Sequence, residues 1–201
     1  MDQDAALNPR KQPKQGRSRA TFQAILEACT QLLHHGGVAA VTTNALAERA
    51  GVSIGSLYQY FPSKEAVLAE LVRGLREEMF TDMVAVLEAP EAASLSKQDL
   101  VYRLVRASLR HHDRSPELAQ VLEMVEEALP MSGEVAEGKA RVGALLITLL
   151  RDIGVVAPEE AARDLVALSA GMARAAVQAG ETDFDALAHR IHRAVVGYLA
   201  L

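Results

Sequence analysis

The side chains that could carry chemistry in this chain are mainly histidines. His111 and His112 precede Asp113, and His189 and His192 lie three residues apart on one predicted helix. Two imidazoles at that spacing can share a metal ion, but a third ligand and an outer shell of hydrogen bonds would also be needed. Capping of a helix end by the first pair and a solvated helix face for the second are the interpretations that we favour.

Other catalytic patterns are missing from the sequence. It contains no phosphate-binding loop, no dinucleotide fingerprint and no nucleophile elbow, and no Cys/His pair has the local context of a catalytic site. We therefore expect a binding protein that is not an enzyme and needs no cofactor. A helical-bundle metalloenzyme that uses the histidines and carboxylates is an alternative.

Composition favours a helical protein of the cytoplasm. Half of the 201 residues are hydrophobic, Trp is absent, and Ala and Leu are abundant. The single cysteine, Cys29, cannot form an internal disulfide, which indicates a reducing compartment. No window approaches the roughly 18 apolar residues of a membrane span. We expect no contact with a membrane.

The charge is unevenly distributed along the chain. The net charge is −5, but residues 1–64 carry +3 and residues 65–201 carry −8. A basic amino-terminal part on an acidic body suits a protein that binds DNA with one part and something else with the other.

The elements that would position a DNA-reading surface lie in residues 42–64, TTNALAERAGVSIGSLYQYFPSK. Thr42 can cap a first short helix, and Gly51 suits the turn that follows it. Ser53 can cap a second helix, in which Leu57 and Phe61 lie four residues apart and share one buried face. This pattern is typical of a helix-turn-helix, whose second helix usually enters the DNA major groove. The second helix is expected to expose Ile54, Gly55, Ser56, Tyr58, Gln59 and Tyr60.

The run GVSIGSLYQYFPSKEAVL resembles the hallmark of the TetR family of bacterial transcriptional regulators, and the resemblance covers roughly residues 18–70. It implies an all-α, nine-helix architecture with an amino-terminal three-helix head and a carboxy-terminal helical bundle that dimerises. It also implies a dimeric repressor that a small-molecule effector releases from a palindromic DNA operator. A DNA-binding regulator that is gated by a protein partner, without a small-molecule ligand, is the alternative.

Residues in and beside the reading helix are expected to contact DNA. Ser56 and Gln59 can hydrogen-bond base edges, and Ile54 can touch a thymine methyl, although the family often has a lysine there. Hydroxyl and ammonium groups suit phosphate oxygens. The full set of expected DNA-binding residues is Thr43, Ser53, Ile54, Gly55, Ser56, Tyr58, Gln59, Tyr60 and Lys64.

Three regions are expected along the chain: a flexible basic arm (1–16), the helix-turn-helix domain (17–62) and a ligand-sensing and dimerisation domain (63–201). Arg10, Lys11 and Lys14 of the arm could follow phosphates or enter a minor groove. Helical periodicity outside 42–64 predicts helices at 18–35, 63–87, 96–112, 115–129, 132–153, 158–180 and from 182 or 183 to the end. Gly74, in the middle of one of them, indicates a close packing contact or a bend.

The resemblance places a ligand pocket and a dimer interface in the body. Flexible methionines and a few polar side chains are the candidate pocket residues, with plain core packing or an exposed face as the alternative. The candidates are Met79, Met83, Tyr102, Arg106, Met124, Met172 and Arg174. The last two helices (158–180 and 182/183–201) are expected to pair with those of a second copy, because the first of them is rich in Ala and Gly. A central helix of a monomeric bundle would explain the same composition.

Overall fold

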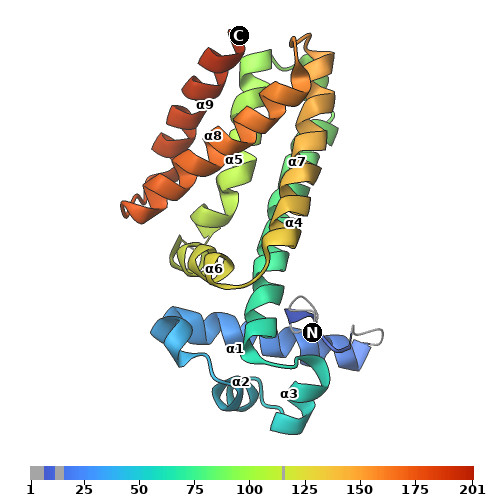
Figure 1. Cartoon of the computed structure of the whole chain (residues 1–201), viewed down its shortest axis with the longest axis vertical. Coiled ribbons are helices and arrows are strands. Elements are labelled where there is room, and N and C mark those ends of the chain that lie inside the picture. Colours follow the sequence, from blue (N-terminus) through green and yellow to red (C-terminus); the bar gives the residue numbers. More distant parts are fainter. Residues whose placement is uncertain (1–6, 12–15, 115) are drawn as a thin grey trace. The chain divides into compact units, whose positions relative to one another are not determined.

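The computed structural model describes residues 7–11, 16–114 and 116–201. Within these residues the chain forms nine α-helices, one short 3₁₀ helix (Ala92–Ser94) and no strand (Figure 1), so the predicted all-α fold is confirmed. The α-helices are α1 (Gly16–Ala40), α2 (Thr43–Arg49), α3 (Ile54–Tyr60), α4 (Lys64–Glu88), α5 (Lys97–Arg114), α6 (Pro116–Ala128), α7 (Ser132–Asp152), α8 (Pro158–Gln178) and α9 (Phe184–Leu199).

The chain divides into two compact units. The first comprises Met1–Leu75 and Glu117–Met131, and the second comprises Arg76–Pro116 and Ser132–Leu201. Helix α4 therefore contributes to both units. The units do not coincide with the expected domains 17–62 and 63–201, because the first part of α4 and nearly all of α6 belong to the first unit. The functional division at residue 62 stays a prediction.

The first unit has an apolar core between its short helices. Helix α1 packs against α2, and α2 packs against α3 (Figure 1). Complete burial of one large apolar side chain in this core contributes on the order of 1.5–3 kcal/mol to the stability of the fold. Burial also raises the pKa of the Cys29 thiol to about 12, so this group stays neutral and packs as a small apolar side chain. Buried side chains of α1 to α3 and their links include Phe22, Ile25, Val41, Leu46, Leu57 and Phe61.

Capping residues lie at helix starts that the sequence predicts within one or two residues. The hydroxyl of Ser63 accepts a hydrogen bond from the Ala66 N–H (3.2 Å) at the start of α4. Asp183 accepts one from the Ala186 N–H (2.9 Å) at the start of α9. Residue 115, at which the sequence predicts the start of the helix that follows α5, lies outside the described residues. Regular helical geometry of α1 is interrupted at Gly36 and Gly37, where the sequence predicts its end.

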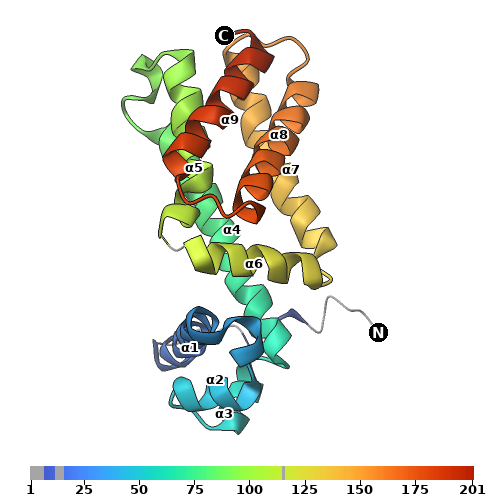
Figure 2. The ribbon, with the colours of Figure 1, turned by 90° about the vertical axis from the view of Figure 1, so that its left-hand side faces the viewer.

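The second unit is a bundle in which α7 packs against α8, α5 against α9, and α8 against α9. Figure 2 shows α8 and α9 side by side. The core residues Val105, Leu165, Leu187 and Ile191 come from three of these helices. Apolar residues recur at helical spacing along these helices, which is why the sequence predicts them.

Helix α4 differs from expectation at its glycine. A Cβ atom built on Gly74 meets no atom within 4 Å, and the residue is exposed. The expected close packing contact within the chain is therefore wrong. None of the helices in the described part of the chain has the length and apolarity that a membrane crossing requires.

Candidate nucleic-acid interface

The turn between α2 and α3 has the geometry that a helix-turn-helix needs. Thr42 caps α2 by accepting a hydrogen bond from the Ala45 N–H at 3.1 Å. Gly51 adopts a φ of +66°, a left-handed conformation that favours glycine. Its N–H donates to the carbonyl of Glu48 (3.1 Å), so the turn closes tightly behind α2. Both roles were predicted from the sequence.

Two serines define the start of α3. The Ser53 hydroxyl accepts a hydrogen bond from the Ser56 N–H at 3.0 Å, and the two side-chain oxygens lie 2.8 Å apart. Ser53 is exposed and Ser56 is half-buried. Both hydroxyls therefore already have a hydrogen-bond partner in the first turn of α3. Any contact that they make with a bound molecule would be additional to it.

The inner face of α3 anchors the helix to the rest of the first unit. Leu57 and Phe61 are fully buried, as predicted. The Phe61 ring stacks on Phe22 of α1, with ring centroids 4.8 Å apart. Phe61 is extended and precedes Pro62, which ends the helix.

The outer face of α3 is exposed and chemically mixed. Ile54 is 41% exposed and Tyr58 is 39% exposed, and Gly55 and Gln59 are also at the surface. The Gln59 amide can donate and accept hydrogen bonds, as an adenine edge requires, while Ile54 offers an apolar contact for a thymine methyl. The structure thus presents four of the expected contact residues together on one seven-residue helix.

Tyr60 was expected on this exposed face, and that expectation is wrong. Its exposed fraction is only 8%, and its ring packs edge-on against Phe22 with centroids 6.2 Å apart. Tyr60 follows Leu57 by three residues, a spacing that also places it on the buried face of a helix. The helical step could therefore have revealed its burial.

Two further expected contacts flank α3. Thr43 is the first residue of α2, Lys64 is the first residue of α4, and both are half-buried. The Lys64 ammonium carries the charge that a phosphate would need. Exposed Arg17, Arg19 and Arg49 add positive charge to the same unit.

The described part of the expected flexible arm is held against the first unit. Leu7 is only 5% exposed, and the Arg10 N–H donates to the carbonyl of Tyr60 at 2.7 Å. No local sequence pattern reports these contacts, because they join residues about fifty positions apart. Lys14 lies outside the described residues.

The residues expected to hold a ligand do not all belong to one unit. Met83 lies in a buried cluster with Leu104 and Ala107, and Met79 is half-buried on the same helix. Met172 packs against the other core cluster of the second unit. Met124, in contrast, is 54% exposed and belongs to the first unit.

The polar candidates already have partners in the second unit. Arg106 forms an ion pair with Asp185 (3.0 Å). The Tyr102 ring stacks on His189, with centroids 4.8 Å apart and the hydroxyl 3.4 Å from Nε2. Arg174 lies exposed on α8. A ligand-binding role for these residues stays a prediction.

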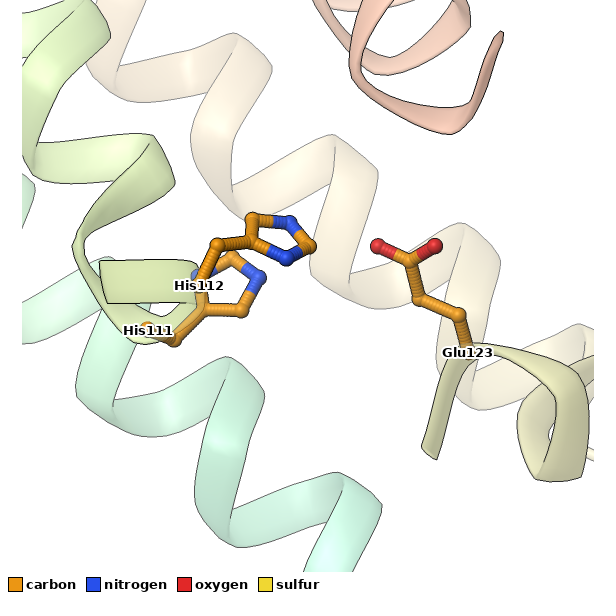
Figure 3. Close-up of side chains that lie close together, drawn as sticks. All are labelled: His111, His112 and Glu123. Atoms are coloured by element: carbon orange, nitrogen blue, oxygen red, sulfur yellow. The ribbon is translucent and has the colours of Figure 1, made fainter. Parts of the chain in front are cut away.

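The histidines at the end of α5 are packed more deeply than expected. Figure 3 shows His111 and His112 next to each other, with ring centroids 4.0 Å apart. His112 is 1% exposed and stacks on Phe184 of α9 at 4.8 Å, so the expected capping role at a solvated helix end is wrong for it. Glu123, also drawn in Figure 3, comes from α6 and thus from the first unit. Two imidazoles supply only half of the ligands that a structural zinc site takes.

The histidines of α9 also have neighbours within the chain. His192 lies with Nε2 3.0 Å from the carbonyl oxygen of Gln98, and its ring meets Tyr102 edge-on. These contacts join α9 to α5. His189 is exposed, as expected for a solvated helix face, whereas His192 is half-buried and packs between the two helices.

Helix α8 has one buried and one exposed face. Its buried residues include Ala162, Leu165 and Val177. The opposite face exposes the small residues Ala167, Ala170, Gly171 and Ala175 together with the charged residues Arg163 and Arg174. A central helix of a monomeric bundle would be covered all round, so the exposed stripe of α8 does not fit that alternative.

The sequence of the chain is similar to those of known proteins. Residues 25–71 match the family model described as "Bacterial regulatory proteins, tetR family". The chain is 31% identical over 105 residues to the HTH-type transcriptional regulator BetI of Rhizobium meliloti (strain 1021), covering 52% of this chain and 50% of BetI. It is 30% identical over 146 residues to the nucleoid occlusion factor SlmA of Alteromonas mediterranea, covering 73% of this chain and 71% of SlmA. The chain thus spans about half the length of several curated relatives and more of this SlmA protein.

The fold is also similar to solved structures. The complex of triclosan with SmeT, a repressor from Stenotrophomonas maltophilia, superposes with a TM-score of 0.65 at 20% identity, covering 89% of this chain and 91% of SmeT. At this identity the likeness concerns the fold alone. The family model matches the helix-turn-helix, and the SlmA match extends over most of both chains. The chain therefore belongs to the tetR family of bacterial regulatory proteins.

Proposed function

We propose that this protein is a sequence-specific DNA-binding transcriptional regulator, and that it acts as a homodimeric repressor released from its operator by a small-molecule effector. The observation that carries the proposal is the exposed outer face of α3, which is mounted by Leu57 and Phe61 on a buried aromatic core. Binding to chromosomal DNA places this activity in the bacterial cytoplasm. The proposed role is regulatory and not enzymatic.

The exposed side chains of α3 suit the major groove. Gln59 can pair with an adenine edge, Ile54 can contact a thymine methyl, and the Tyr58 hydroxyl suits a phosphate oxygen. Gly55 has no side chain, so its backbone can approach the groove closely. Lys64 and Thr43 are the proposed phosphate ligands on either side of α3.

We propose that the exposed stripe of α8, together with α9, forms the dimer interface. Small side chains permit close approach of helices, and Ala167, Ala170 and Gly171 lie exposed on one face. Two copies related by a twofold axis would place two reading helices in successive major grooves of a palindromic operator, about 34–36 Å apart.

The effector part of the proposal rests on α4 and on the fold relatives. Helix α4 runs without interruption from the end of the helix-turn-helix into the second unit. A ligand that binds better to one arrangement of α4 would shift the population away from the DNA-binding form. The triclosan complex of SmeT supports a small molecule as the effector class. Met79, Met83, Tyr102, Arg106, Met172 and Arg174, all in the second unit, are the candidates to contact it.

DNA binding can be tested by fluorescence anisotropy with fragments that flank the protein's own gene, measured across a salt series. We compare the wild type with the double variant Tyr58→Ala/Gln59→Ala, because both side chains are exposed and neither belongs to the core. Nanomolar binding to one palindromic fragment that falls steeply with salt, and that the double variant loses, supports specific reading. Weak binding that is indifferent to sequence and to the substitutions would refute it.

The same assay separates the two modes of regulation. Release of the wild type by members of a small-molecule library supports an effector. DNA binding that no small molecule alters, but that a protein from the same cell changes, would favour a regulator gated by a protein partner. Neither outcome concerns the contacts between α3 and DNA, so the proposal that α3 reads DNA does not depend on the mode of regulation.

A further inference from the structure

The carboxyl end of α3 depends on a segment far away in the sequence. The last carbonyl groups of a helix have no partner within the helix, and a helix of seven residues is only marginally stable alone. The carbonyl of Leu57 accepts a hydrogen bond from the N–H of Phe61 at 2.9 Å. The carbonyl of Tyr60 accepts the backbone N–H of Arg10 at 2.7 Å, and that of Tyr58 accepts Nη1 of Arg10 at 3.2 Å.

This segment is attached in turn to α4. Arg73 donates from Nη1 to the carbonyl of Leu7 and from Nη2 to Oδ1 of Asn8, both at 3.1 Å. Glu70 pairs with the same guanidinium at 3.1 Å and fixes its orientation. The Leu7 side chain is buried, so apolar packing adds to the hydrogen bonds. All these residues belong to the first compact unit.

We propose that residues 7–10 form a strap that positions the reading helix, and that Arg10 is a positioning residue for DNA recognition and not a phosphate ligand. The inference rests on the proposed DNA binding. The positive charge of Arg10 lies at the negative end of the α3 dipole, where a cation is stabilising. Its bonds to two carbonyls of the last turn restrain the half of α3 that carries Tyr58 and Gln59.

The strap also gives α4 a second connection to α3. The direct connection runs through residues 61–63, and the strap adds a path from Arg73 through Leu7 and Asn8 to Arg10. A displacement of α4 would therefore pull on the carboxyl end of α3 as well as on its link. Arg73 is in this sense a second positioning residue, although it lies on α4 and not on the reading helix.

The two possible roles of Arg10 differ in their salt dependence. A phosphate ligand adds about one unit to the slope of log affinity against log salt concentration. A positioning residue changes the affinity at every salt concentration and leaves the slope unchanged, because it releases no counterion. It also changes the dynamics of α3 in the free protein, which a phosphate ligand on the surface does not.

The test uses the full-length protein with Arg10→Met and Arg73→Met, and with Lys11→Met as matched control. Lys11 is the adjacent basic residue and is exposed. Hydrogen–deuterium exchange of residues 54–61 is measured without DNA. Affinity is measured by anisotropy over a salt series, with the fragment upstream of the protein's own gene that the wild type binds best. Circular dichroism checks folding, and Arg73→Lys replaces Arg73→Met if that variant unfolds.

We expect Arg10→Met and Arg73→Met to accelerate exchange in α3 and to weaken DNA binding about tenfold, the loss of roughly one charged hydrogen bond, with an unchanged salt slope. Lys11→Met should leave exchange in α3 as in the wild type. Unchanged exchange with a slope lowered by about one in Arg10→Met would make Arg10 a phosphate ligand and overturn the strap. Unchanged exchange and affinity would overturn it as well.

Failure of the proposed function gives a different result. If the wild type binds none of the DNA fragments, the DNA-binding proposal fails, and the exchange measurement still decides the strap. Faster exchange of α3 in Arg10→Met then supports a structural strap without a role in DNA reading, whereas exchange equal to that of the wild type refutes the strap.

Discussion

Gly51 is the residue on which the α2–α3 turn depends most directly. Its φ of +66° lies in the left-handed region, and a Cβ atom there would meet no atom within 4 Å. The cost of Gly51→Ala is therefore backbone strain alone, and we expect a loss of about 1–2 kcal/mol in the free energy of unfolding. Urea denaturation followed by circular dichroism measures it.

Gly74 provides the matched control for this prediction. It also leaves open space for a Cβ atom, but it lies in the middle of α4. Gly74→Ala should therefore stabilise the protein by about 0.5–1 kcal/mol, opposite in sign to Gly51→Ala. Equal effects of both substitutions would contradict the backbone explanation of the turn.

At the scale of residues, the sequence was most informative about local contacts. Thr42 and Ser53 cap the helices that it predicts, because a cap involves residues only three positions apart. His112 was misplaced because its burial depends on an aromatic partner in another helix, whereas the burial of Tyr60 could have been inferred from its spacing to Leu57. The contact of Arg10 with α3 spans 48 positions, and no periodicity encodes it.

At the scale of elements, helix α4 is linked to α7 by an ion pair and a cation–π contact that share one arginine. Arg141 donates two hydrogen bonds to Glu77 (2.7 and 3.2 Å), and its guanidinium lies 4.1 Å from the centroid of the Phe80 ring. The hydrogen bond from Arg141 lowers the pKa of Glu77. Both side chains of the ion pair are more than half exposed, so solvent screens their attraction.

This pair should make a small, pH-dependent contribution to stability. Because the pKa of Glu77 is lower in the folded state, its contribution is present above the unfolded pKa and is lost as the pH falls through the folded pKa. A double-mutant cycle with Glu77→Gln and Arg141→Gln should give a small stabilising coupling at neutral pH and none in acid. Urea denaturation at both pH values measures it, with Lys139→Gln as the control on α7. A coupling that persists in acid would contradict the ion-pair origin.

The helices themselves were predicted well, whereas the two compact units were not predicted from the sequence. Periodic apolar positions and stop signals gave starts and ends within a few residues, including the interruption of α1 at Gly36 and Gly37. The compact units follow from contacts between distant segments, such as the inclusion of residues 117–131 with the first unit. Such contacts depend on three-dimensional packing, which one sequence does not display.

At the scale of the whole molecule, the family and the fold could be predicted because the helix-turn-helix run is specific. The effector contacts could not, because methionines at helical spacing occur equally in ordinary cores. Met83 indeed lies in such a core, with Leu104 and Ala107. The charge difference between the two ends of the chain agrees with a DNA-binding amino-terminal part and a body that binds an effector. Charge alone does not identify the operator or the effector.

Dimerisation is the property of the whole molecule that a single surface substitution can test. Ala167 lies on the exposed stripe of α8, and Ala167→Glu would place an unpaired carboxylate in the proposed interface. We expect the dimer dissociation constant to rise at least about tenfold, since desolvating an unpaired charge costs several kcal/mol. Sedimentation velocity over a concentration series measures it.

The same substitution should weaken operator binding without altering the reading helix. Two linked heads bind a palindrome more tightly than two separate ones, because the second head is held at a high effective concentration. Ala140→Glu, at an exposed alanine of α7, introduces the same charge elsewhere and should leave both dimer and DNA affinity unchanged. If Ala167→Glu stayed dimeric and bound the operator as the wild type does, the interface would have to lie on another face, and the proposed spacing of the two α3 helices would fail with it.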